Sequence, residues 1–163
     1  MQQFSLYYAL SAAIDKTVCT LTGKSYERNL RMVILVSNLE AQENLNKTLW
    51  TYSQKEFIPH GSNLDPLPSS QPVYITDKLE RPNEADMLII VNSDDIIKIL
   101  NNNAYISLFK RIMIISDLLN QATLTEITEW VNRTKIKDMI IDFYKQNPNN
   151  AWTEFDPNLP LQS

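Results

Sequence analysis

The chain has 163 residues, of which 44% are hydrophobic and 21% are charged, and its formal net charge at pH 7 is −4. These values are typical of one soluble globular domain that is long enough to bury its own core. An acidic balance excludes a generally basic, phosphate-neutralising surface, so strong and direct binding to nucleic acid is not expected.

The counts of glycine, histidine and cysteine exclude several kinds of site. The chain has two glycines, Gly23 and Gly61, so neither a three-glycine dinucleotide turn nor a phosphate-binding loop can be assembled. One histidine and one cysteine cannot form a zinc site of the usual nitrogen and sulfur type. We therefore expect no cofactor and no metal.

The single Cys19 cannot form an internal disulfide, which is consistent with a reducing compartment. Residues 1–5 lack the basic and apolar regions of a secretory signal, and no run of about 18 apolar residues predicts a membrane span. We expect a cytoplasmic protein, with Cys19 buried beside Val18 on the first helix.

Strand and helix patterns alternate along the chain. In order they predict a strand at 4–8, a helix at 10–25, a strand at 32–36, a helix ending near 50, strands at 73–75 and 87–91, a helix from 96, a strand at 112–115, a helix from 123 and a strand at 139–144. Three of these strands are apolar throughout, which is typical of strands buried on both faces. The prediction is an α/β fold, a three-layer Rossmann-like sandwich with a mostly parallel central sheet.

Two helix starts are predicted from capping boxes, in which Ser or Thr and a Glu three residues later cap the first N–H groups. These are Ser37 with Glu40 and Thr123 with Glu126. We expect one domain over residues 1–152, followed by an extended or disordered tail at 153–163.

The segment that follows the second predicted helix carries the strongest family signal. It reads Leu49-Trp50, a spacer of six residues, Phe57-Ile58-Pro59-His60, a loop rich in Pro and Ser, and then Pro72-Val73-Tyr74-Ile75. This order and spacing closely resemble the chi subunit of bacterial DNA polymerase III. Matching features continue from Phe4 to Trp152; they include the aromatic strand at 4–8, Val18-Cys19, Tyr26, Arg31 and the strand at 32–36.

The resemblance implies a non-catalytic accessory subunit of the DNA polymerase III holoenzyme. Such a subunit links the clamp loader, through a psi-like partner, to the acidic C-terminal tail of the single-stranded-DNA-binding protein during DNA replication. It would contact DNA only indirectly, and polymerase activity would belong to the holoenzyme as a whole. A monomer alone, or a heterodimer with the psi-like partner, is implied.

Two docking surfaces are implied by the same resemblance. The expected psi or clamp-loader site consists of Trp50, Phe57, Ile58, Pro59 and His60. The expected tail site consists of Trp130, Arg133, Lys135, Ile136, Lys137 and Met139. An acidic peptide that ends in an aromatic residue and a carboxylate requires cations beside an apolar slot, and these residue types provide both.

The tail site departs from the family pattern at two positions. Val131 stands where a lysine often follows the aromatic residue, and Ile127 stands where some members have arginine. Helical spacing would bring Arg133 near Trp130 and place Lys137 on the same helix face as Arg133. Cations are therefore expected at this site, but not at the usual positions.

Each of these residues also has a purely structural interpretation. Trp50, Phe57 and Trp130 are of the type that fills a core, and cations at a helix end stabilise its dipole. His60 is a candidate general base, but the sequence contains no recognisable nucleophile and acid to accompany it. A structural hydrogen bond at the loop entrance is the favoured role for His60.

A different function class stays open beside the adaptor. Open α/β sheets bind ligands at the carboxyl ends of their strands, so the fold permits a small nucleotide-binding protein or enzyme with a degenerate phosphate loop. The glycine count argues against this alternative.

Overall fold

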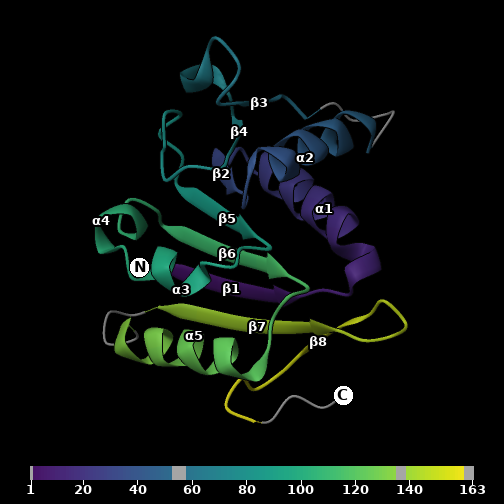
Figure 1. Cartoon of the computed structure of the whole chain (residues 1–163), viewed down its shortest axis with the longest axis vertical. Coiled ribbons are helices and arrows are strands. Elements are labelled where there is room, and N and C mark those ends of the chain that lie inside the picture. The colour runs from purple at the N-terminus through teal and green to yellow at the C-terminus, as the bar shows by residue number, and fades with distance from the viewer. Residues whose placement is uncertain (1, 53–57, 135–138, 160–163) are drawn as a thin grey trace.

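The computed structural model describes residues 2–52, 58–134 and 139–159, which form one α/β sandwich (Figure 1). Its strands are β1 (Gln3–Tyr8), β2 (Met32–Leu35), β3 (His60–Ser62), β4 (Val73–Thr76), β5 (Met87–Val91), β6 (Arg111–Ser116), β7 (Ile140–Gln146) and β8 (Trp152–Glu154). Its helices are α1 (Ile14–Glu27), α2 (Leu39–Thr51), α3 (Ile96–Leu100), α4 (Asn103–Ile106) and α5 (Gln121–Thr134), with 3₁₀ turns at Ser11–Ala13 and Pro68–Ser70. The predicted fold class is confirmed.

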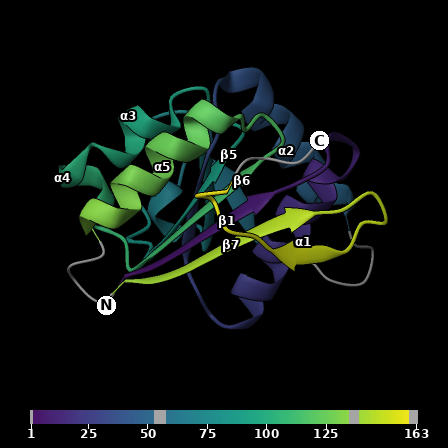
Figure 2. The same cartoon turned by 90° about the horizontal axis from the view of Figure 1, so that it is seen from below.

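The eight strands form a single sheet in the order β3-β4-β2-β5-β6-β1-β7-β8. Neighbouring strands from β3 to β7 run parallel, and β8 alone returns antiparallel to β7. Helices cover both faces, with α3, α4 and α5 on one side and α1 and α2 on the other (Figure 2). No helix in the described part of the chain is long and apolar enough to cross a bilayer.

The central strands supply side chains to two separate cores. In β2, Val33 and Leu35 join the cluster under α3, α4 and α5, whereas Met32 and Ile34 join the cluster under α1 and α2. This division follows from the two-residue period of a strand. It confirms that the apolar run is buried on both faces, and Cys19 lies in the second core as expected.

Both capping-box predictions are wrong, because an asparagine lies closer to each helix start. The Asn38 side chain accepts a hydrogen bond from the Ala41 N–H at 2.9 Å, while the Ser37 hydroxyl donates to another loop. The Asn120 side chain accepts from the Thr123 N–H at 2.8 Å, and α5 therefore begins at Gln121. Asn is as effective as Ser at this position.

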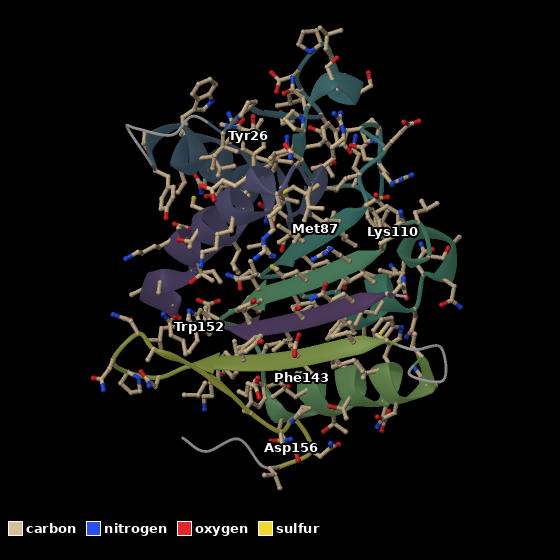
Figure 3. The ribbon with its side chains drawn as sticks, turned by 180° about the vertical axis from the view of Figure 1, so that it is seen from behind. Tyr26, Met87, Lys110, Phe143, Trp152 and Asp156 are labelled. Carbon is tan, nitrogen blue, oxygen red and sulfur yellow. The ribbon has the colours of Figure 1, made fainter. Side chains whose placement is uncertain are left out.

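The short strands β3 and β8 were not predicted. β8 forms a hairpin with β7 in which Trp152 pairs with Gln146 and Glu154 with Tyr144 (Figure 3). After the hairpin, the Phe155 ring packs edge-on against Phe143 at a centroid distance of 5.9 Å. The strand and the Phe155 contact place the first residues after 152 against the sheet.

Candidate functional site

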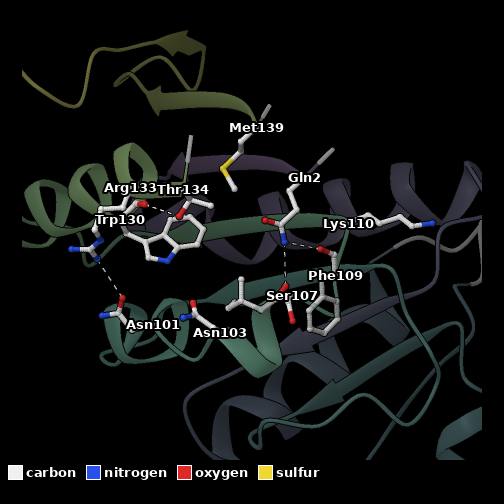
Figure 4. Close-up of a pocket in the computed structure, with 11 residues that line it drawn as sticks. Gln2, Asn101, Asn103, Ser107, Phe109, Lys110, Trp130, Arg133, Thr134 and Met139 are labelled. Carbon is white, nitrogen blue, oxygen red and sulfur yellow. Dashed lines mark hydrogen bonds between the residues drawn. The ribbon is translucent and has the colours of Figure 1, made fainter. Parts of the chain in front are cut away.

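A groove of about 810 Å³ opens where α5 and the start of β7 approach the α3–α4 segment (Figure 4). Its lining combines apolar, amide and cationic side chains: Gln2, Asn101, Asn103, Ile106, Ser107, Phe109, Lys110, Trp130, Arg133, Thr134 and Met139. Three residues of the predicted tail site, Trp130, Arg133 and Met139, are thus brought together.

Trp130 lies at the floor of this groove and belongs mainly to the core. Its side chain is only 4% exposed, its indole N–H donates to the Leu100 carbonyl at 2.9 Å, and its ring packs against Phe4 at 5.5 Å. The interpretation of Trp130 as a core residue is therefore correct, and the same ring also lines the groove.

Cationic groups stand at the rim. The exposed Arg133 guanidinium donates to the Asn101 side-chain oxygen at a long 3.4 Å. The Lys110 ammonium lies 3.7 Å from an Asp86 carboxylate, and both groups face solvent. Such exposed contacts hold a side chain weakly, so both cations are available to a ligand.

Lys110 was missed by the sequence analysis. It comes immediately before β6, whereas Trp130 and Arg133 lie on α5 and Met139 comes immediately before β7. The parallel register pairs Gln3 with both Arg111 and Ile140, which brings the starts of three strands to one edge. Positions just before neighbouring parallel strands lie at the same edge of the sheet, so the place of Lys110 just before a predicted strand was the feature of the sequence that could have identified it.

Lys135, Ile136 and Lys137 lie outside the described residues, as does Phe57. Their predicted roles remain predictions. Thr134 and Met139, the described residues on either side of this gap, both line the groove.

The remaining residues of the predicted psi site lie on the other side of the sheet, at the end of α2. Trp50 is 55% exposed, and its ring lies 5.0 Å from the His60 imidazole. Ile58 is buried in the core under α1 and α2, and Pro59 is half-buried. Among the described members, Trp50 therefore offers the large apolar surface.

His60 is held between main-chain carbonyls. Its Nδ1 lies 2.7 Å from the Ile58 carbonyl oxygen and its Nε2 lies 3.3 Å from that of Asn46. In the neutral ring one nitrogen donates to its carbonyl, and the other also faces a carbonyl oxygen instead of a group that could give it a proton. The geometry fits the expected structural hydrogen bond and gives no support to a general base.

The protein-family comparison bears on this chain as a whole. Residues 1–132 match the family model described as "DNA polymerase III chi subunit, HolC". The chain belongs to the DNA polymerase III chi subunit family. The match extends from β1 almost to the end of α5, so it includes both Trp50 and Trp130.

A curated relative leads to the same family. The chain is 46% identical over 154 residues to "Probable DNA polymerase III subunit chi" of Rickettsia prowazekii (strain Madrid E), which covers 94% of this chain and 92% of the relative. The resemblance noted from the sequence is therefore confirmed. Membership in the chi family gives the chain an accessory role among the subunits of DNA polymerase III.

Proposed function

We propose that this chi-family chain is a non-catalytic adaptor that holds two polypeptides at once. One is a psi-like subunit of the clamp loader, and the other is the acidic C-terminal tail of the single-stranded-DNA-binding protein. The observation that carries the proposal is the groove at Trp130, where an apolar floor meets cations at the rim.

The groove offers an acidic, aromatic-ended tail two kinds of contact. The tail's terminal ring packs against the apolar side chains of Ile106, Trp130 and Met139. Its carboxylates pair with Arg133 and Lys110, because a guanidinium and an ammonium form charge-assisted hydrogen bonds with carboxylates. Lys135 and Lys137 are proposed to extend this cationic rim.

Trp50 is proposed as the anchor for the psi-like partner. An exposed indole backed by the ordered His60 ring loses little conformational freedom on binding, and Trp is enriched among residues that dominate interface energies.

The two proposed surfaces lie on opposite faces of the sheet, because Trp50 belongs to the α2 side and Trp130 to the α5 side. Both partners can then bind at the same time. This arrangement supports the proposed adaptor function, in which a weak contact with one tail gains strength when many tails line one coated strand.

The alternative of a nucleotide-binding enzyme receives no support from the strand ends. The charged residues that line the cleft at the carboxyl ends of β2 and β5 are three carboxylates, Asp77, Asp94 and Asp95, and one cation, Lys98, so the carboxylates are in excess. Carboxylates repel phosphate, so this cleft is a poor nucleotide site.

The test is titration calorimetry with an acidic peptide that ends in phenylalanine. Arg133→Ala is expected to weaken binding severalfold and to reduce its salt dependence, since a rim cation is lost. Arg28→Ala is the matched control, because Arg28 is an exposed arginine at the end of α1 on the other side of the sheet. Equal affinities for the wild type and Arg133→Ala would overturn the assignment of the groove.

A further inference from the structure

A second groove, of about 530 Å³, lies on the opposite face of the sheet from Trp130. It runs between α1 and the β7–β8 hairpin, where the labelled Trp152 stands beside the start of α1 (Figure 3). Neither proposed docking surface uses it: Trp50 and Trp130 are both absent from its described lining.

Three aromatic rings form the floor of this groove, and the Tyr7 ring contacts each of the other two. The Tyr7 and Tyr144 rings stack at 5.1 Å, and the Trp152 ring meets Tyr7 edge-on at 5.3 Å. The register explains the cluster, since Tyr7 pairs with Tyr144 across β1 and β7, and Trp152 pairs with the residue two positions after Tyr144. All three side chains are half-buried, so each retains an accessible surface.

The hairpin that carries Trp152 is internally fixed. The Asn147 side chain accepts hydrogen bonds from the Asn149 N–H at 2.9 Å and the Ala151 N–H at 3.0 Å. Trp152 is therefore held at the groove before any ligand arrives, which lowers the entropic cost of binding.

Lysines form the opposite wall. Lys16 and Lys24 are exposed on α1 and line the groove eight residues apart, a spacing that keeps both on one side of the helix. At 1.5 Å per residue their backbones are about 12 Å apart. Within the described residues neither lysine forms an ion pair. Two cations so far apart suit two separate anionic groups better than one.

Charge is divided across the groove. Asp142 and Glu154 lie on the sheet side of the groove. Asp142 precedes Tyr144 by two residues on β7, and Glu154 pairs with Tyr144 from β8. Burial, followed by the charges of Asp142 and Glu154, raises the pKa of the Tyr144 phenol, and burial, followed by Tyr144 and Asp142, raises the pKa of Tyr7. The phenols therefore stay neutral, and an anionic backbone is directed towards α1 and away from the sheet.

Much of the groove's polar lining is already occupied by internal hydrogen bonds. The Gln146 side chain accepts from the Leu10 N–H and donates to the Asn150 carbonyl, the Thr17 hydroxyl donates to the Ala13 carbonyl, and the Thr20 hydroxyl bonds that of Tyr52. A peptide laid here would find few partners for its main-chain amides, at a cost for each group left unsatisfied. Flat bases require only ring faces.

We propose that this groove binds a short stretch of single-stranded nucleic acid, with bases against Tyr7, Tyr144 and Trp152 and phosphates along Lys16 and Lys24. Aromatic platforms beside a line of cations are the usual means of holding single strands without sequence preference. The acidic net charge of the chain limits the affinity but leaves this local patch intact. The site goes beyond the adaptor role, since it gives the chain a direct contact with the strand.

Fluorescence anisotropy of a labelled oligothymidylate at low salt tests the proposal with the full chain. Trp152→Ala is expected to weaken binding at least about fivefold, the lower end of the range for one base stacked on an aromatic ring. The double variant Lys16→Ala/Lys24→Ala should lower the slope of log affinity against log salt by about 1.4, since each single-strand phosphate contact contributes roughly 0.7. Trp152→Phe and Lys16→Arg/Lys24→Arg should retain most of the binding.

Controls separate this site from the tail groove. Arg133→Ala should leave oligothymidylate binding unchanged, and Lys16→Ala/Lys24→Ala should leave binding of the acidic peptide unchanged, so each proposal can fail alone. Thermal melts of every variant monitor folding. Absence of binding by the wild type at low salt, or equal binding by the wild type and both alanine variants, would overturn the proposal. Binding of the acidic peptide that is lost in the Lys16→Ala/Lys24→Ala variant would instead make the groove a peptide site.

Discussion

The indole N–H of Trp130 donates to the main-chain carbonyl of Leu100 at 2.9 Å and thereby joins α5 to the C-terminal end of α3. One side chain thus closes the core and forms the floor of the proposed tail groove. Because the same indole ring has both roles, substitutions at Trp130 are expected to change the stability of the fold and the binding of the tail together. Variants at the rim of the groove are the cleaner probes of function.

Trp130→Ala is expected to destabilise the fold by about 3–5 kcal/mol, because it removes a large buried aromatic side chain. Trp50→Ala should change the free energy of unfolding by no more than about 0.5 kcal/mol, since the indole is mostly exposed. Urea denaturation followed by circular dichroism measures both. A comparable loss in the two variants would contradict the assignment of Trp50 as a surface anchor.

Trp50→Ala should weaken co-purification of a psi-like partner while leaving binding of the acidic peptide unchanged. The expected loss is about thirtyfold or more, the scale typical of a tryptophan hot spot of 2 kcal/mol. Surface plasmon resonance with the purified partner measures the loss. Leu118→Ala provides a matched control, because Leu118 has a similar exposure of 56% and lies between β6 and α5.

Cys19 is expected to resist thiol reagents in the native state. It is fully buried, and burial, followed by the Asp15 charge, raises the pKa of the thiol to about 12. Since the thiolate is the reactive form, labelling by a disulfide reagent at neutral pH should proceed only as the chain unfolds. Rapid and complete labelling of native protein would show that the core under α1 opens easily.

Stability is expected to decline in alkaline solution. Burial is the main cause that raises the pKa of Cys19, Tyr74 and Tyr105 above the ordinary values of 9.0 for the thiol and 10.0 for the phenols. Above those values the unfolded chain loses protons that the folded chain retains. The contribution of these groups to the free energy of unfolding is therefore fully present below about pH 9 and is lost as the pH rises. Each group contributes at most about 1.4 kcal/mol per pH unit.

Thermal melts across this range measure the alkaline effect. In Cys19→Ala the decline should begin at higher pH, because only the phenols remain. A melting temperature that stays constant from neutral pH to well above 10.0 would contradict the burial of these groups.

The start of α5 can be tested directly. Asn120→Ala should cost about 0.5–2 kcal/mol, the usual value of an N-cap, whereas Glu126→Ala should cost little because the residue is exposed within the helix. Urea denaturation distinguishes the two. Equal costs would restore the capping box of Thr123 and Glu126.

Long apolar runs made the fold class predictable. A strand covered by helices on both faces has apolar residues at every position, as the central strands of a parallel sheet do. β3 and β8 escaped prediction because each has only three residues, too few to show a strand pattern. Each lies at an edge of the sheet and pairs with one strand, β3 with β4 and β8 with β7. Helical spacing correctly brought Trp130 and Arg133 together. Lys110 and Asn103 come from another part of the chain: the sheet register brings Lys110 to the groove from just before β6, and Asn103 reaches it from α4.

The position of β1 in the sheet also determines the order of events during synthesis. Its two neighbours are β6, at Arg111–Ser116, and β7, at Ile140–Gln146, so β1 gains its first partner only after β6 has been made and its second only after β7. Such non-local pairing is slow and leaves an apolar strand exposed to aggregation meanwhile. A fragment that stops at residue 132, where the family match ends, lacks β7 and would leave one edge of β1 permanently open.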